Sequence, residues 1–234
     1  SKHHHVISLK RLAEEATDWW AAEALREADS GSTSADTIRR ILAVASGING
    51  NHNHKAMQDC HAILTDRLAN EVLALAEKLQ KKDAEVAKLS KEVQPQSAKD
   101  AAMQINNEIT AAAKHGASPK HPSMEKAKTI ANILIVEEKK RYALRALRFA
   151  QTAQARDLES AKQAPDGVPE VGPASEQADL IEKEINRALN LGAAETDQSI
   201  KDAHSIAKSL RDADGERKRL KSRQKRLTST TASA

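Results

Sequence analysis

Apolar side chains recur between residues 68 and 93 at alternating spacings of four and three residues, and this heptad pattern limits the possible folds more than any other feature. Seven of its eight positions are apolar, and Lys82 is the exception. Such a pattern indicates a helix with a continuous apolar stripe that packs against other helices. The eight positions are Leu68, Val72, Leu75, Leu79, Lys82, Val86, Leu89 and Val93.

The helix that carries this stripe is expected over about residues 54–93, and at 1.5 Å per residue it would be roughly 60 Å long. Ala69 and Ala76 widen the apolar face beyond the seam of a two-stranded coiled coil. Only Lys78 with Asp83 offers an attractive pair to a parallel homodimer. We therefore expect this helix to pack in a bundle of three or more helices, with its stripe as an interface.

Glycine and proline mark where the other helices are expected to begin and end. Gly47 is expected to cap a helix, Pro95 to break one, and Gly215 to weaken the last one. A Pro/Gly linker is expected at 164–174 and a helical hairpin after it, with Gly192 as the cap of its first arm. The other helices are expected at about 8–29, 35–46, 97–115 and 123–163.

The composition fits an all-α protein. Only 2% of residues are aromatic, and 42 of the 234 are alanine, which disfavours a β-sandwich or β-barrel and leaves a thin core. We expect an elongated helical bundle of coiled-coil hairpins with a basic C-terminal tail. No internal repeat is evident beyond a loose reuse of hairpins. The expected domains are an N-terminal helical pair (1–53), a long-helix body (54–163), the linker (164–174), and a hairpin with the basic tail (175–234).

Cysteine use and hydropathy limit the compartment. The single Cys60 excludes an internal disulfide framework. The longest all-apolar run, 133–136, is far too short to span a bilayer, and the N-terminal residues lack the apolar stretch of a classical signal peptide. We expect a protein of the cytoplasm or of a particle assembled there.

The C-terminal segment 216–226 holds seven basic residues and one acidic residue, although the whole chain has a net charge of only +4. Such a segment can bind phosphates in a salt-sensitive, sequence-independent way, but no aromatic side chain is present to stack on bases. An acidic protein surface, an anionic membrane and a purely solubilising role remain open. The candidate residues are Arg217, Lys218, Arg219, Lys221, Arg223, Lys225 and Arg226.

Arg141, Arg145 and Arg148 lie on one face of an expected helix and form a second candidate for binding phosphate or an acidic partner. A solvated helix face, with Glu137 paired to Arg141, is the alternative.

The adjacent Trp19 and Trp20 are expected to anchor packing, either within the chain or at an interface. The same helix is acidic, so we do not expect a membrane partner.

Four residues are weak candidates for a metal site: His52, His54, Cys60 and His61. Their spacing matches no recognised zinc motif, and on a helix Cys60 and His61 point about 100° apart. We predict no metal and no cofactor.

No catalytic motif is present, such as a nucleophile elbow, a Walker-type loop or a paired-cysteine metal motif. We therefore expect a non-enzymatic structural protein that forms a homo-oligomer or packs within a larger assembly. A virion is one setting, with the chain as an internal, ejected or scaffolding component. The alternative is a nucleic-acid-associated accessory protein that uses the basic tail.

Overall fold

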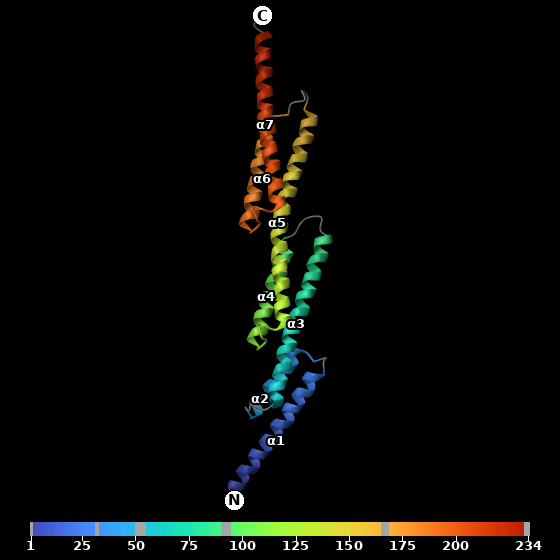
Figure 1. Cartoon of the computed structure of the whole chain (residues 1–234), viewed down its shortest axis with the longest axis vertical. Coiled ribbons are helices and arrows are strands. Elements are labelled where there is room, and N and C mark those ends of the chain that lie inside the picture. Colours follow the sequence, from blue (N-terminus) through green and yellow to red (C-terminus); the bar gives the residue numbers. More distant parts are fainter. Residues whose placement is uncertain (1, 31–32, 50–54, 90–94, 165–168, 232–234) are drawn as a thin grey trace. The chain divides into compact units, whose positions relative to one another are not determined.

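The protein is all-α in the computed structural model, which describes residues 2–30, 33–49, 55–89, 95–164 and 169–231 (Figure 1). These residues form seven helices and no strand. The helices are α1 (Lys2–Asp29), α2 (Ala35–Asn49), α3 (Lys55–Leu89), α4 (Pro95–Lys114), α5 (Pro122–Gln163), α6 (Pro173–Asn190) and α7 (Gln198–Thr231).

Several of the expected helix boundaries need correction, and the first is the start of α1, which lies at Lys2 rather than near residue 8. The helix α2 continues through Gly47, and α7 continues through Gly215, because one glycine inside a helix costs only about 1 kcal/mol. Pro95 begins α4 rather than only ending the helix before it, since the first helical residue needs no N–H donor. In the described residues, no helix is both long enough and apolar enough to cross a membrane.

The chain divides into two compact units that alternate along the sequence. Unit 1 comprises residues 1–83 and 100–133, and unit 2 comprises residues 84–99 and 134–234. The domain boundaries expected from the sequence stay predictions.

The core of unit 1 includes a cluster between α2 and the beginning of α3. Ile38 and Cys60 are fully buried in it, and Met57 is 2% exposed. Trp20 reaches this cluster from α1, which packs side by side with α2. The first two helices are thus held by one apolar cluster on the third.

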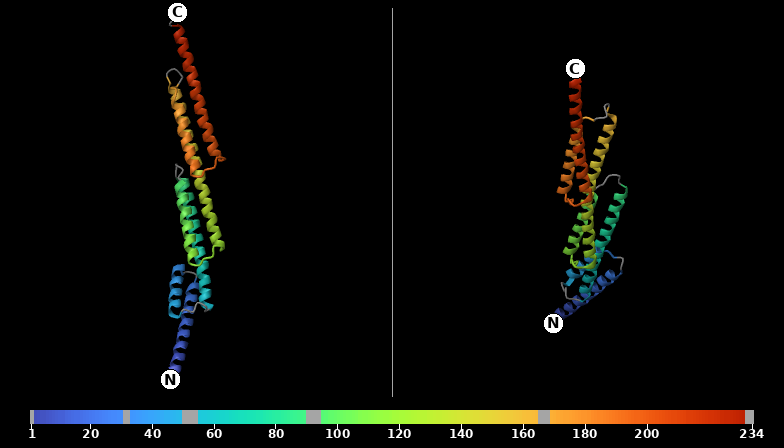
Figure 2. Two further views of the ribbon diagram at one scale, coloured as in Figure 1. Left: turned by 90° about the vertical axis from the view of Figure 1, so that its left-hand side faces the viewer. Right: turned by 45° about the horizontal axis from the view of Figure 1, so that its top comes forward.

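Unit 2 contains a three-helix core built from α5, α6 and α7, and Figure 2 shows α6 and α7 lying side by side. The contribution of α5 is small side chains, namely Ala143, Ala146, Ala150 and Ala153. Isoleucines from α6 and α7 pack onto these alanines. Alanine on one helix lets the backbones approach closely, so few large side chains are needed to close the core.

The buried positions reveal an internal repeat that is not evident in the sequence alone. Ile38, Ile105 and Ile181 are all fully buried. The interval from Ile38 to Ile105 also separates other core positions of α2–α3 from core positions of α4–α5. The interval from Ile105 to Ile181 likewise separates core positions of α4–α5 from those of α6–α7. These sets are Ala35, Ala102 and Ala178; Met57, Met124 and Ile200; Cys60, Ala127 and Ala203; and Leu64, Ala131 and Ala207, all of which are buried.

The turns of the second and third hairpins end their first helices in the same way. Gly116 and Gly192 are separated by the same interval as Ile105 and Ile181, and their φ angles are 99° and 93°. The residue after each glycine donates its backbone N–H back to a helix carbonyl, from Ala117 to Ala112 and from Ala193 to Ala188, both at 3.0 Å. This is a glycine-terminated helix cap. One helical hairpin is therefore used three times.

Candidate functional site

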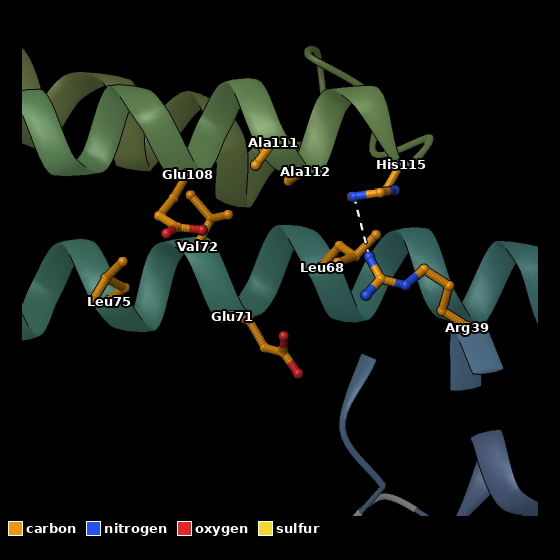
Figure 3. Close-up of a pocket in the computed structure, with 9 residues that line it drawn as sticks. All are labelled: Arg39, Leu68, Glu71, Val72, Leu75, Glu108, Ala111, Ala112 and His115. Carbon is orange, nitrogen blue, oxygen red and sulfur yellow. Dashed lines mark hydrogen bonds between the residues drawn. The ribbon is translucent and has the colours of Figure 1, made fainter. Parts of the chain in front are cut away.

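A pocket of about 420 Å³ lies in unit 1 beside α3 and α4 (Figure 3). Its apolar lining comes mainly from Leu68, Val72 and Leu75 on α3, and alanines of α4 face them. Its polar lining consists of Arg39, Glu71, Glu108 and His115.

Three of these polar groups already have partners in the fold. The Arg39 guanidinium forms an ion pair with Asp36 and donates to His115 Nε2 at 3.1 Å, as the dashed line in Figure 3 marks. The Glu71 carboxylate accepts the backbone N–H of Ala35 at 3.1 Å, at the positive end of α2. No serine, threonine or cysteine lines the pocket. This arrangement organises α2 and α4 around α3 and specifies no reaction.

The described residues contain no cluster of three or more His, Cys, Asp or Glu side chains that could hold a metal ion. Cys60 is fully buried, and His61 is exposed. His52 and His54 lie outside the described residues. Desolvation in the core raises the pKa of the Cys60 thiol to about 11, as expected for a structural cysteine.

A buried polar cluster in unit 2 ties α7 to α5 and to the start of α6. Arg217 donates from its two Nη atoms to the two carboxylate oxygens of Asp157 at 2.8 and 2.6 Å, and each side chain is only 10% exposed. Three residues earlier, Asp214 is 1% exposed and accepts the Gly172 backbone N–H at 2.6 Å. The Lys218 ammonium lies 3.1 Å from the other Asp214 oxygen.

The chemistry of these groups follows from their contacts. The N–H of Gly172, and next to it the charges of Lys218 and Arg217, hold the pKa of Asp214 below its ordinary value despite burial. The hydrogen bonds to Asp157 raise the pKa of Arg217. Both charges fasten helices to one another, and Arg217 is therefore mostly buried against Asp157.

The other candidates in the basic tail lie on the surface of α7. Lys218, Arg219, Lys221, Arg223, Lys225 and Arg226 are exposed. A shallow groove of about 310 Å³ is lined by Lys218, Arg219, Ser222, Arg223 and Arg226, so the structure gathers most of these cations on one face.

The three arginines of α5 have separate environments within unit 2. Arg141 donates to the Ser97 hydroxyl at 3.2 Å. Arg145 forms an ion pair with Glu184 of α6 at 3.3 Å. Arg148 is exposed. They do not converge on one ligand-binding surface.

The residues predicted to form an interface differ in their exposure to solvent. Trp19 is 60% exposed, whereas Trp20 packs on the core with its ring edge-on to Trp19 at a centroid distance of 4.9 Å. Val72 is buried inside unit 1. The remaining described stripe residues, Leu68, Leu75, Leu79 and Val86, are half-buried, and Leu89 and Val93 have no described side chain. Val72 therefore packs within its own unit, and the interface role of the other stripe residues stays a prediction.

Comparisons of the chain with protein-family models, curated proteins and solved structures found no match. The geometry is therefore the basis for the functional proposal.

Sequence reasoning missed Asp157, Asp214 and Gly172 as partners of the basic segment. The signal in the sequence is weak, because Asp157 is far from Arg217 along the chain and no motif links them. The internal repeat places Arg141 and Arg217 at corresponding positions, but it does not identify the partner of either side chain.

Proposed function

We propose that this chain is a non-enzymatic structural protein that self-associates through its N-terminal helix. The described pocket and polar clusters support this role, because their charged groups fasten helices to one another and form no nucleophile–base pair.

The observation that carries the proposal is the exposure of two large apolar side chains on α1. Leu12 and Trp19 are each 60% exposed and stand two helical turns apart, which places them on one face of the helix. A tryptophan is typical of the apolar centre of a protein interface, and Leu12 extends the apolar surface around it.

A second copy of α1 is the partner that this stripe fits best. Two α1 helices that cross in antiparallel orientation bring Leu12 of each copy against Trp19 of the other, as twofold symmetry requires. The surrounding surface carries both signs of charge, since Arg11 forms an ion pair with Glu15 at 3.0 Å. Such a face does not repel its own copy.

Light-scattering mass across a gel-filtration peak tests this proposal. The wild-type chain should give a discrete oligomer, and the double variant Leu12→Ser/Trp19→Ser should give a monomer. Leu158→Ser is the matched control, because Leu158 is 57% exposed on α5, and it should leave the oligomer intact. A wild-type monomer at high concentration, or an oligomer that survives the double variant, would contradict the proposal.

A virion is a setting that suits a helical structural subunit of this kind, as an internal, ejected or scaffolding component. This setting stays a prediction.

A further inference from the structure

The last helix continues beyond the helices with which it packs in unit 2. Arg217 of α7 stands level with Asp157 of α5, which it binds. The helix α5 ends less than two turns after Asp157, at Gln163, whereas α7 runs almost four turns beyond Arg217, to Thr231. The helix α5 therefore does not extend along the last turns of α7.

The internal repeat shows what the corresponding stretch of α5 does. In α5, Ala143, Ala146 and Ala150 are buried under the α6–α7 hairpin, and Tyr142 packs at the edge of the same core. At the interval that separates Ile38 from Ile105, the matching α3 positions are Ala76, Leu79 and Asp83, of which Ala76 and Asp83 are buried and Leu79 is half-buried. This face of the long helix is thus apolar and covered in α5, and the corresponding positions of α3 are buried or half-buried.

The corresponding face of α7 is cationic rather than apolar. At the interval that separates Ile105 from Ile181, the α5 residues Tyr142, Ala143, Ala146, Leu147 and Ala150 correspond to Lys218, Arg219, Ser222, Arg223 and Arg226. These five α7 residues are the ones that line the exposed groove. The face that receives a hairpin in α5 is therefore a cationic groove in α7.

A further hairpin of the same kind does not fit this groove. Covering it with an apolar hairpin would remove several guanidinium groups from water, which is strongly unfavourable unless the covering surface supplies negative charges. A partner must instead bring a row of negative charges and leave the cations partly hydrated.

We propose that this groove binds the phosphate backbone of a nucleic acid, an activity beyond the proposed structural role. Arg219, Arg223 and Arg226 follow one another at spacings of four and three residues, so their side chains form a row along one helix face. Guanidinium groups bind phosphate oxygens in a bidentate manner. The described part of α7 offers no aromatic side chain for base stacking, so the binding does not depend on sequence.

The acidic helix α1 of a second copy is a weaker match for the groove. Two of its carboxylates already have partners, since Glu15 pairs with Arg11 and Glu23 with Arg26 at 2.6 Å. A nucleic acid instead offers one negative charge per nucleotide and releases condensed counterions when it binds.

Fluorescence anisotropy with the full chain and labelled DNA of about 30 nucleotides, both single-stranded and duplex, tests the proposal. The variant Arg219→Gln/Arg223→Gln/Arg226→Gln removes the row. A control, Lys114→Gln/Lys120→Gln/Lys126→Gln, removes the same charge from exposed positions elsewhere. The arginine variant should lose on the order of 100-fold in affinity near 0.1 M salt, and its log–log salt slope should fall by about two to three. The control should retain wild-type binding within a few-fold.

Three results would overturn the proposal: no binding of either DNA by the wild-type chain at low salt, equal losses in the two triple variants, or a salt slope that the arginine variant leaves unchanged. If the arginine variant instead lowers the mass of the oligomer while DNA binding is absent, the groove takes a second copy. Light scattering on the same samples keeps this test separate from that of α1.

Discussion

Arg217 and Asp157 form a bidentate ion pair across unit 2, with hydrogen bonds of 2.8 and 2.6 Å between side chains that are each 10% exposed. The pair joins the last helix to α5 at the level where the apolar core of the unit ends. Removing one member leaves the other charge buried without its partner, which costs far more than losing a surface ion pair.

Arg217→Met should therefore lower the free energy of unfolding by about 3 kcal/mol or more. The double variant Arg217→Met/Asp157→Leu should recover part of that loss, because neither charge is then left alone. Arg145→Met is the control, since its ion pair with Glu184 is half exposed and should contribute about 1 kcal/mol at most. Urea unfolding followed by circular dichroism measures all four proteins. Equal losses of unfolding free energy for Arg217→Met and Arg145→Met would show that the buried ion pair contributes no more to stability than the half-exposed one.

The lowered pKa of Asp214 predicts a pH-dependent contribution to stability. A carboxyl whose pKa is lower in the folded state stabilises the fold above its unfolded value of about 3.9, and this contribution disappears as the pH falls through the folded value. Asp214→Asn keeps the acceptor for Gly172 but loses the charge beside Lys218. The stability difference between wild type and this variant should be largest near neutral pH and shrink below about pH 4. Asp212→Asn, at an exposed neighbouring position, should show a small difference at every pH.

Cys60 is expected to be chemically inert in the folded protein, because it is fully buried and its pKa is raised to about 11. A thiol reagent such as Ellman's should react slowly with the native chain near neutral pH and quickly in urea. Rapid reaction of the native chain would show that the cluster around Cys60 opens readily.

Replacement of Cys60 also tests the repeat. The corresponding positions are Ala127 and Ala203, so Cys60→Ala should cost about 1 kcal/mol or less, while Cys60→Ser buries a hydroxyl and should cost about 1–3 kcal/mol. Thermal unfolding compares the two variants. A larger loss for alanine than for serine would argue against an apolar environment equivalent to the other two.

The positions of the helices could be predicted from the sequence, because apolar periodicity and the proline and glycine residues are local signals. Pro122 and Gly192 delimit helices close to where the pattern placed them. The repeat was harder to see. The interval from Ile38 to Ile105 differs from the interval from Ile105 to Ile181, so no single period exists. Many of the shared positions are also alanine, which is common throughout this chain.

The roles of individual charges could not be predicted, because they depend on contacts between distant segments. Arg217 and Arg219 look alike in a run of cations, yet one is buried against Asp157 and the other lines an open groove. Only the packing of α5 beside α7 separates them.

Two glycines of unit 2 should respond to alanine in opposite directions. Gly192 has a φ of 93°, and an added Cβ would stand 3.2 Å from Lys139 Cε, so Gly192→Ala should destabilise the protein by about 1–2 kcal/mol. Gly215 lies inside α7, where an added Cβ meets nothing within 4 Å, so Gly215→Ala should stabilise it by about 0.5–1 kcal/mol through helix propensity. Urea unfolding of the two variants checks both signs. A destabilising Gly215→Ala would mean that α7 is not a continuous helix through this residue, and that the basic groove is not held in line with the core of unit 2.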